Sequence, residues 1–309
     1  MAEPQHVPVL LEESLNFLNV REGGVVVDCT LGFGGHASAI CRRLGASGKL
    51  IAFDRDELAM ARARARLEEL AEELGTAMPL VEYVARPFSE IAEVIKPGER
   101  DGLLADFGVS SMQLDEAHRG FSFRHDGPLD MRMDPSKGES AEQVVNQEDE
   151  NVLADLIYEY GDERRSRRIA RAIVRARPIS TTAELARVIS GAAPPIYGEK
   201  IHPATRTFQA IRIRVNDELG EIRSLLQCAG SLLKPGGRLV LISFHSLEDR
   251  LVKDAFKDWK DAKVFEVLTR KPVIAEEQEM LRNPRSRSAK LRAAEKLGSE
   301  PLKSRKQHR

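Results

Sequence analysis

The residues of this chain best suited to do chemistry are aspartates that stand beside glycines at the ends of apolar runs. Asp28 ends the run Val25–Val27 and precedes a turn, Gly32–His36, that contains three glycines. Asp54 ends the next apolar run, twenty residues after Gly34. A glycine turn lets the backbone approach a nucleotide-like ligand closely, and an acid at the tip of the following strand accepts hydrogen bonds from ribose hydroxyls. The pattern predicts a site for an adenosine cofactor, and both NAD and S-adenosylmethionine carry that ribose.

A third aspartate, Asp106, follows the apolar residues 102–105 and precedes Phe107–Val109, Ser110 and Ser111. At the end of a strand it would offer an acceptor, with two hydroxyls beside it, next to the group that a bound cofactor transfers. The alternative is that Asp106 only caps a turn. A kinase is excluded, because the chain has neither a Val-Ala-Ile-Lys strand nor a His-Arg-Asp motif.

Aromatic and imidazole side chains add further candidates. Phe88 could pack on an adenine face, or it could belong to the core of a short helix. His118, His125 and His245 could act as acids or bases, although packing or loop hydrogen bonding is the favoured interpretation for each. No two histidines stand at a metal-ligand spacing with an acid, so no metal site is predicted.

Alternating strands and helices must position these residues. Strands are predicted at residues 25–29, 49–54, 80–85, 102–106, 238–244 and 264–268. Helices are predicted over residues 56–74 and 203–233. A short helix is predicted after Pro87, with Ser89 as its N-cap, and another begins at a capping box at Ser246. The C-terminal tail favours helix to about residue 297. Repeated strand–helix–strand units imply a parallel sheet with right-handed crossovers, and such sheets bind ligands at the carboxyl ends of their strands.

The strand pattern stops between Gln113 and His202. A crossover connection normally needs little more than a dozen residues, and this stretch is far longer. We therefore predict an α/β fold in which residues 1–112 and 203–309 form a Rossmann-like sheet. Residues 113–202 would form an inserted, all-helical domain that recognises the substrate.

Charge is unevenly distributed along the 309 residues, although the net charge is only −1. Residues 161–214 and 282–309 each carry a net charge of +8, which leaves −17 for the remainder. This asymmetry predicts a polyanionic partner. The chain has no apolar run of about 18 residues, so no membrane span is expected. Three widely spaced cysteines and an N-terminus without a basic, apolar leader favour a reduced, cytoplasmic protein.

The sharpest basic feature is the segment Arg164–Arg177, which contains no acid. Its arginines recur at spacings of four, three and four and would share one helix face: Arg164, Arg168, Arg171 and Arg175. Neighbouring arginines repel one another, so contact with phosphates explains the segment better than a solvated face does. Arg206 and Arg212 add positive charge further along the chain.

Six motifs, in this order, resemble the bacterial small-subunit ribosomal RNA cytosine-N4 methyltransferase family. They lie at residues 6–13, 28–36, 106–115, 119–134, 202–210 and 242–250, and the resemblance continues to residues 283–295. Phe107 stands where the family pattern has leucine, which is an apolar exchange.

The resemblance implies an S-adenosylmethionine-dependent enzyme with a class I methyltransferase sheet and a helical insert. It places cofactor contacts on Gly34, Gly35, His36, Asp54, Phe88, Asp106 and Gln113. It also implies the product, a methyl group on the exocyclic N4 of cytidine 1402 in the decoding region of 16S rRNA. The implied partner is 16S rRNA or the small ribosomal subunit, and a homodimer is left open.

Cytosine N4 is a weak nucleophile, because its lone pair is delocalised into the ring. An acceptor at the N–H would localise that pair and take the proton as the methyl group arrives. Asp106 or a carbonyl of its loop is the candidate acceptor, with Ser110 and Ser111 nearby. Enzymes that methylate DNA amino groups commonly use an Asp-Pro-Pro-Tyr type of motif here, and this chain lacks its prolines and its stacking aromatic.

Two other functions stay open on the residues alone. A nicotinamide oxidoreductase would share the glycine turn and Asp54, but it has no use for an arginine helix. A non-catalytic ribosome-assembly factor would keep the basic faces and would tolerate the loss of Asp54 and Asp106.

Overall fold

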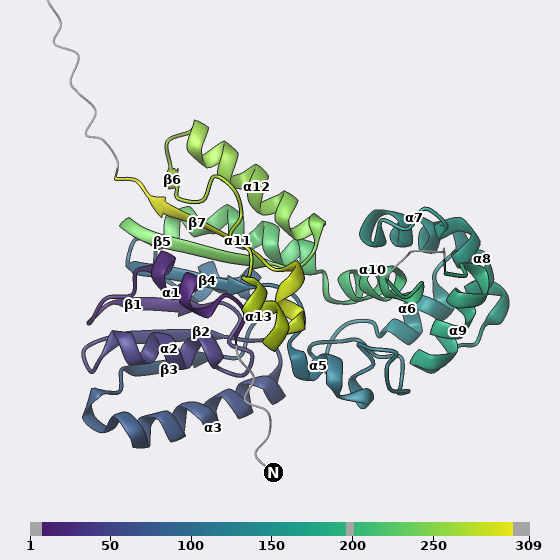
Figure 1. The fold of residues 1–309 in the computed structure, drawn as a ribbon, viewed down its shortest axis with the longest axis horizontal. Coiled ribbons are helices and arrows are strands. Elements are labelled where there is room, and N and C mark those ends of the chain that lie inside the picture. Colours follow the sequence, from purple (N-terminus) through teal and green to yellow (C-terminus); the bar gives the residue numbers. More distant parts are fainter. Residues whose placement is uncertain (1–7, 196–200, 299–309) are drawn as a thin grey trace, which may run out of the picture. The chain divides into compact units, whose positions relative to one another are not determined.

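The computed structural model describes residues 8–195 and 201–298. Contacts within the chain divide it into two units (Figure 1). The sheet unit consists of residues 1–108 and 221–309, and the helical unit consists of residues 109–220.

The sheet unit is built on one seven-stranded sheet with the order β3-β2-β1-β4-β5-β7-β6. The strands are β1 Val25–Asp28, β2 Lys49–Phe53, β3 Leu80–Val84, β4 Arg100–Asp106, β5 Leu233–Ser243, β6 Phe265–Val267 and β7 Lys290–Lys296. The first five strands of this order are parallel, and β7 runs antiparallel to both of its neighbours. The predicted Rossmann-like α/β sheet is confirmed.

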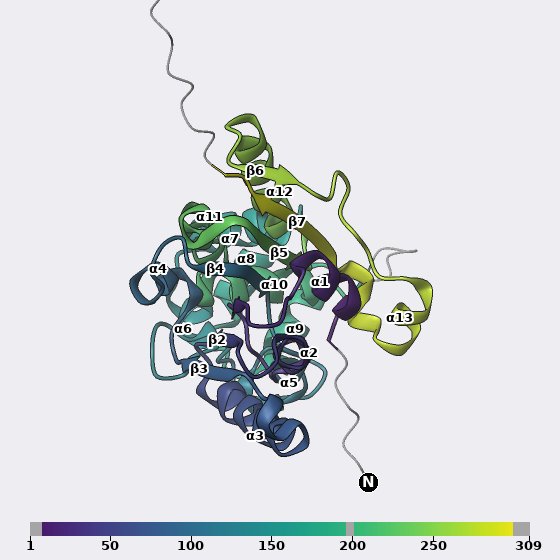
Figure 2. The ribbon, with the colours of Figure 1, turned by 90° about the vertical axis from the view of Figure 1, so that its left-hand side faces the viewer.

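Helices cover both faces of the sheet, since successive side chains of a buried strand point to opposite sides. Val26 and Leu104 pack with α1, α2 and α3 on one face, whereas Val27 and Leu103 pack with α4, α11 and α12 on the other. Figure 2 shows α1 and α2 on one side of the sheet and α4 and α11 on the other. The helices are α1 Leu11–Leu18, α2 Gly35–Leu44, α3 Glu57–Leu74, α4 Ile91–Val94, α11 Glu218–Leu232, α12 Ser246–Asp261 and α13 Glu277–Arg282, with 3-10 turns at Gly75–Ala77, Phe88–Glu90 and Pro284–Ser288.

Two predicted elements are wrong. The tail predicted to favour helix forms strand β7 instead, and its Leu291 and Ala293 are buried between β5 and β6. The single helix predicted over 203–233 is two helices, α10 Ala204–Asn216 and α11, separated by Asp217 in the left-handed conformation at φ 45°. Asp217 interrupts an otherwise continuous helical pattern, because a short polar side chain tolerates positive φ.

The helical unit consists of short helices around one core. They are α5 Ser111–Asp115, α6 Ala141–Gln147, α7 Glu150–Gly161, α8 Ser166–Ala176, α9 Thr182–Ala192 and α10, with a 3-10 turn at Ala117–Arg119. Leu153, Ile169, Ile173 and Phe208 are among the buried residues of that core. Among the described residues of both units, no helix is long and apolar enough to cross a membrane.

The unit boundaries differ from the predicted domain limits. Contacts place them after residues 108 and 220, whereas the sequence pattern placed them after residues 112 and 202. The second difference is due to α10, which packs against α7 and buries Phe208 and Ile211 in the helical core.

Two buried polar side chains hold the long loop between α5 and α6. Arg119 donates from Nη2 to the carbonyls of Arg132 (3.1 Å) and Met133 (3.0 Å). Asn216, at the end of α10, accepts from the Met133 N–H and donates to the Met131 carbonyl, both at 2.8 Å. These bonds satisfy backbone groups that the loop cannot pair by itself.

Replacing Asn216 by leucine is expected to destabilise the protein by about 2–4 kcal/mol, because two buried backbone groups of the loop would lose their partners. Urea unfolding followed by circular dichroism measures this free energy. Asn151→Leu, at an exposed position of α7, is the matched control and should change it by less than about 0.5 kcal/mol. Equal stability of the two variants would show that Asn216 does not hold the loop.

Candidate active site at the carboxyl ends of the strands

The glycine turn after β1 takes a conformation that other residues adopt poorly. Gly32 and Gly34 have φ of 51° and 70°, in the left-handed region. The turn is closed by a hydrogen bond from the Gly34 N–H to the Leu31 carbonyl (2.8 Å), and Gly34 precedes the first residue of α2. A Cβ on Gly35 would collide with the Pro8 ring. The glycines are therefore required by the fold of the turn, and the contacts of Gly34 and Gly35 with cofactor stay predictions.

Asp54 holds this turn from the end of β2. Its Oδ2 accepts from the Gly32 N–H and its Oδ1 from the Asp56 N–H, both at 2.8 Å. Burial raises the pKa of Asp54 to about 6. Each carboxylate oxygen has a second lone pair, so the same group can also accept from a ribose hydroxyl, as predicted.

Asp28 and Asp106 are linked through one threonine. Asp28 Oδ1 accepts from the Thr30 N–H at 3.1 Å, and Thr30 Oγ1 accepts from the Asp106 N–H at 2.7 Å. The two aspartates end β1 and β4, which are neighbours in the sheet. The sequence placed both acids at the carboxyl edge, but the threonine that joins them was missed, because a Thr after Asp28-Cys29 has no distinctive signal.

One oxygen of each acid is buried and has no hydrogen-bond partner among residues 8–195 and 201–298: Asp28 Oδ2 and Asp106 Oδ1. Burial, with a smaller effect from the charge of Asp54, raises the pKa of Asp28 to about 7. Burial, together with the charges of Asp28 and Glu248, raises the pKa of Asp106 well above its ordinary value. A buried acceptor without a donor costs about 1–3 kcal/mol. The pair therefore fits a ligand that carries N–H donors and positive charge, as S-adenosylmethionine does.

His36 lies at the start of α2, between the N-terminal segment and Asp106. Its Nε2 is 3.1 Å from the Val9 carbonyl, which can only accept, so this nitrogen carries a proton. Its Nδ1 lies 3.9 Å from Asp106 Oδ2. The His36 side chain is buried. The predicted cofactor residue His36, in the first turn of α2, thus lies beside the predicted acceptor Asp106 at the end of β4.

Phe88 opens the 3-10 turn after β3 and is partly buried. Its ring centroid lies 5.9 Å from that of Phe107, at the end of β4. Ser89 does not cap a helix as predicted. Its N–H and hydroxyl both donate to Glu221, at 3.1 and 2.9 Å. Phe88 therefore borders the same strand ends from the side of β3, and its contact with adenine stays a prediction.

The predicted residues after Val109 belong to the helical unit. Ser110 and Gln113 form a capping box at the start of α5: the Gln113 N–H donates to Ser110 Oγ (3.3 Å), and Gln113 Oε1 accepts from the Ser110 N–H (2.9 Å). Ser111 begins α5, and its side chain lies outside the described part of the structure. The Ser110 hydroxyl already serves as a helix cap, so its predicted catalytic role gains no support.

Arg168, Arg171 and Arg175 lie on the exposed side of α8, whereas Arg164 is exposed in the turn that precedes this helix, so the predicted single helix face contains three of the four arginines. Arg171 pairs with Glu150 of α7 at 3.4 Å. Arg164, Arg168 and Arg175 have no ion-pair partner within residues 8–195 and 201–298. Arg164, Arg168, Arg171 and Arg175 together make up what we call the α8 face. Three of its guanidinium groups are thus available to a polyanion.

The two later arginines differ. Arg206 is partly exposed and lies 3.9 Å from the buried carboxylate of Glu163. Arg212 donates from Nε and Nη2 to both oxygens of Glu218, at 2.7 and 2.9 Å, and its side chain is only 15% exposed. The prediction that Arg212 binds RNA is therefore withdrawn, since a local ion pair already occupies its guanidinium group.

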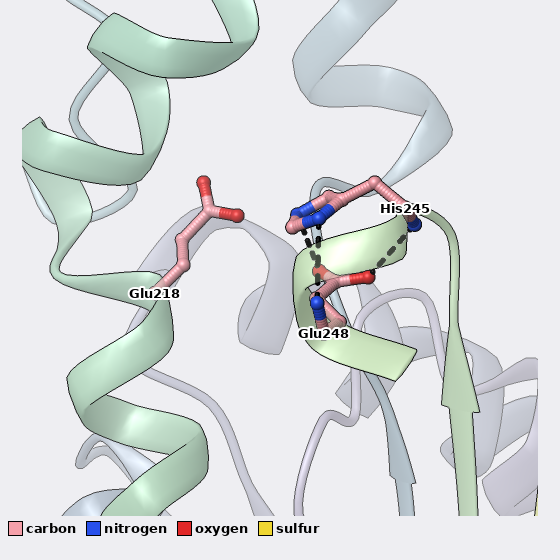
Figure 3. Close-up of side chains that lie close together, drawn as sticks. All are labelled: Glu218, His245 and Glu248. Atoms are coloured by element: carbon pink, nitrogen blue, oxygen red, sulfur yellow. Dashed lines mark hydrogen bonds and ion pairs between the residues drawn. The ribbon is translucent and has the colours of Figure 1, made fainter. Parts of the chain in front are cut away.

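A buried imidazole–carboxylate pair follows β5. His245, not Ser246, is the N-cap of α12, and the Glu248 carboxylate accepts from the backbone N–H groups of Phe244 (2.7 Å) and His245 (3.2 Å). The His245 ring and the Glu248 carboxylate are drawn in Figure 3. His245 therefore has the packing role that was favoured. His118 and His125 are exposed, and His118 lies 3.7 Å from Glu116.

Comparison with known proteins decides the family. The model of the MraW methylase family matches residues 3–297. The chain belongs to the MraW methylase family. It is similar to "Ribosomal RNA small subunit methyltransferase H" of Acidobacterium capsulatum, at 64% identity over 96% of this chain and 100% of the relative. The protein of the same name from Koribacter versatilis is 57% identical over 94% of this chain and 93% of the relative. Among solved structures, a putative rRNA-methylase from Clostridium thermocellum matches 96% of this chain and 100% of that chain, with 13% identity and a TM-score of 0.46.

Membership of the MraW methylase family confirms the resemblance found in the sequence. The protein is a methyltransferase, and its cofactor is S-adenosylmethionine. The nicotinamide alternative is therefore wrong, although it shares the glycine turn and Asp54.

The raised pKa of Asp28, about 7 in the folded chain against 3.8 for the ordinary carboxyl, predicts a pH dependence of stability. The folded state binds the proton more tightly than the unfolded state, so the free energy of unfolding without cofactor should fall as pH rises from about 4 to 7. Urea unfolding at pH 5 and pH 8 measures the fall, and Asp28→Asn should reduce it. Asp254→Asn, at an exposed position of α12, should leave it unchanged. An identical pH dependence in wild type and Asp28→Asn would contradict the assignment.

Proposed function

We propose that this protein transfers the methyl group of S-adenosylmethionine to the exocyclic N4 of a cytidine in small-subunit ribosomal RNA, cytidine 1402 of the decoding region. The observation that carries the chemistry is the unpartnered, buried oxygen of Asp106 at the end of β4. The relatives named as small-subunit ribosomal RNA methyltransferases support the substrate. With ribosomal RNA as its substrate, the protein is also proposed to work in the cytoplasm.

The sheet unit supplies the cofactor contacts in this proposal. The glycine turn admits the nucleoside close to the backbone, and Asp54 accepts from the ribose while it holds that turn. Asp28 Oδ2 accepts from an amino group of the cofactor, and Phe88 lies against the adenine. When bound, S-adenosylmethionine supplies an activated methyl group on a positively charged sulfur.

Asp106 supplies the proton acceptor. Its Oδ1 has no donor within the described chain, so it can take a hydrogen bond from the target amine, localise the nitrogen lone pair and remove the proton. The positive charge of the bound cofactor favours the ionised form of Asp106, which burial alone disfavours. The chain thus needs no Pro-Pro-Tyr motif to present an acceptor at this strand end.

The helical unit supplies the RNA contacts. Arg164, just before α8, and Arg168 and Arg175 within it are exposed and have no ion-pair partner among the described residues, and phosphates are natural partners of such a group of charges. Arg206 stays in the proposed set, and Arg212 is left out because Glu218 holds it. The target base must leave its stack to reach a buried acceptor.

Purified protein is expected to transfer a labelled methyl group to small ribosomal subunits that lack the modification, and nuclease digestion with mass spectrometry should find N4-methylcytidine. Asp106→Asn cannot accept the proton, so its single-turnover rate should fall by about 100-fold or more. Because Asp106 is also a predicted cofactor contact, the rates are compared at saturating S-adenosylmethionine, and its dissociation constant is measured for both proteins.

Naked 16S rRNA and assembled subunits are compared as substrates. Asp254→Asn is the matched control, and its rate should equal that of wild type. A full rate in Asp106→Asn would show that another group takes the proton. The absence of any methyl transfer by wild type to either substrate would favour the assembly-factor alternative.

Reversing the charges of the α8 face tests the RNA contacts. The triple variant Arg164→Glu, Arg168→Glu, Arg175→Glu should raise KM for the subunit about tenfold or more, leave cofactor affinity unchanged, and reduce the salt dependence of binding. The control reverses the same number of exposed positive charges on another helix, at Lys253, Lys257 and Lys260 of α12. An equal rise of KM in both variants would indicate a general charge effect and would contradict a specific role of α8.

A further inference from the structure

The acid that accepts the proton has a base beside it. His36 Nδ1 lies 3.9 Å from Asp106 Oδ2 within the sheet unit. Because His36 Nε2 is bound to the Val9 carbonyl at 3.1 Å, the neutral ring carries its proton on Nε2 and presents the Nδ1 lone pair on the side of Asp106. The ring is buried, with 8% of its side chain exposed, and so cannot turn freely.

Asp106 needs such a base. Burial and the charges of Asp28 and Glu248 raise the pKa of this carboxyl, so a proton taken from the substrate leaves it slowly. A carboxyl group that keeps its proton cannot accept another one. A second base within reach would return Asp106 to the ionised form.

We propose that His36 is a positioning residue for methyl transfer, and that its Nδ1 receives through Asp106 the proton that the target amine loses. This inference rests on the proposed function. As the N4–carbon bond forms and the electron pair of the carbon–sulfur bond stays on sulfur, Asp106 takes the N4 proton. The carboxyl then passes this proton to His36 Nδ1. An imidazolium next to a carboxylate results, and the imidazolium later releases the proton to water.

The groups around the pair favour this charge arrangement. Asp28 at the end of β1 and Glu248 of α12 both contribute negative charge at Asp106. His245 lies on the far side of Glu248, with its Nε2 3.1 Å from Glu248 Oε1. A positive charge on His36 would lie beside Asp106, whose own surroundings already include the negative charges of Asp28 and Glu248.

His36→Gln separates the relay from the packing role. A glutamine amide can still donate to the Val9 carbonyl, but it cannot take up a proton. We expect its steady-state turnover number at pH 7, with S-adenosylmethionine saturating, to fall about tenfold or more, because Asp106 must be deprotonated again before each new turnover. The dissociation constant for S-adenosylmethionine is measured alongside. The acid limb of its pH–rate profile should move to higher pH, because Asp106 must then lose its proton directly to water. His118→Gln, at a side chain that is 67% exposed, is the control.

A measurement on the wild-type ring makes the test independent of how well the variant folds. Nitrogen NMR of histidine-labelled protein, bound to S-adenosylhomocysteine, should show His36 as the Nε2–H tautomer at high pH. Its titration midpoint should shift in Asp106→Asn.

A wild-type rate and pH profile in His36→Gln, or an unchanged His36 titration in Asp106→Asn, would overturn the relay. A fall in rate matched by an equal loss of cofactor affinity would also overturn it, because the side chain would then be purely structural. Wild-type protein that binds the cofactor but methylates no RNA would instead contradict the proposed function, and the NMR coupling would still report on His36.

Discussion

Buried carboxyl groups at the carboxyl ends of adjacent parallel strands are the constraint on which the site depends. Asp28, Asp54 and Asp106 end β1, β2 and β4 or directly follow them, and burial raises the pKa of each. Asp54 is compensated by two backbone N–H groups and thereby holds the glycine turn. The other two acids each keep one oxygen without a donor. Ionising these buried carboxyl groups is therefore unfavourable, and a positively charged ligand reduces the free energy that it costs.

The cost has a functional consequence. A sulfonium cofactor and the ionised aspartates stabilise one another, so cofactor binding and deprotonation are linked. The product of methyl transfer has a neutral sulfur, and it stabilises these carboxylates less. The same acids can therefore attract the cofactor, accept the substrate proton and favour product release, provided that the proton has a path away from Asp106. His36 lies where that path would begin.

Much of this arrangement could be predicted from the sequence. The strands that carry the three aspartates, the glycine turn and the exposed α8 face follow from local patterns of apolar, glycine and arginine residues, because each pattern is set by neighbours within a few positions. The errors share a different cause. Strand β7 contains leucine, alanine and charged residues that also fit a helix, and its place between β5 and β6 makes it a strand. The sequence predicted that Arg212 binds RNA, but its guanidinium group forms an ion pair with Glu218, which lies just after the helix interruption at Asp217.

The sequence by itself determined the family, the α/β sheet and the edge at which the acids gather, since parallel strands bring their carboxyl ends together wherever they occur in the chain. Tertiary structure decided which polar atoms are satisfied. The link from Thr30, which follows Asp28, to Asp106 and the approach of His36 to Asp106 depend on distances of a few ångströms. Those distances arise from packing among residues far apart in the chain, and no local pattern encodes them.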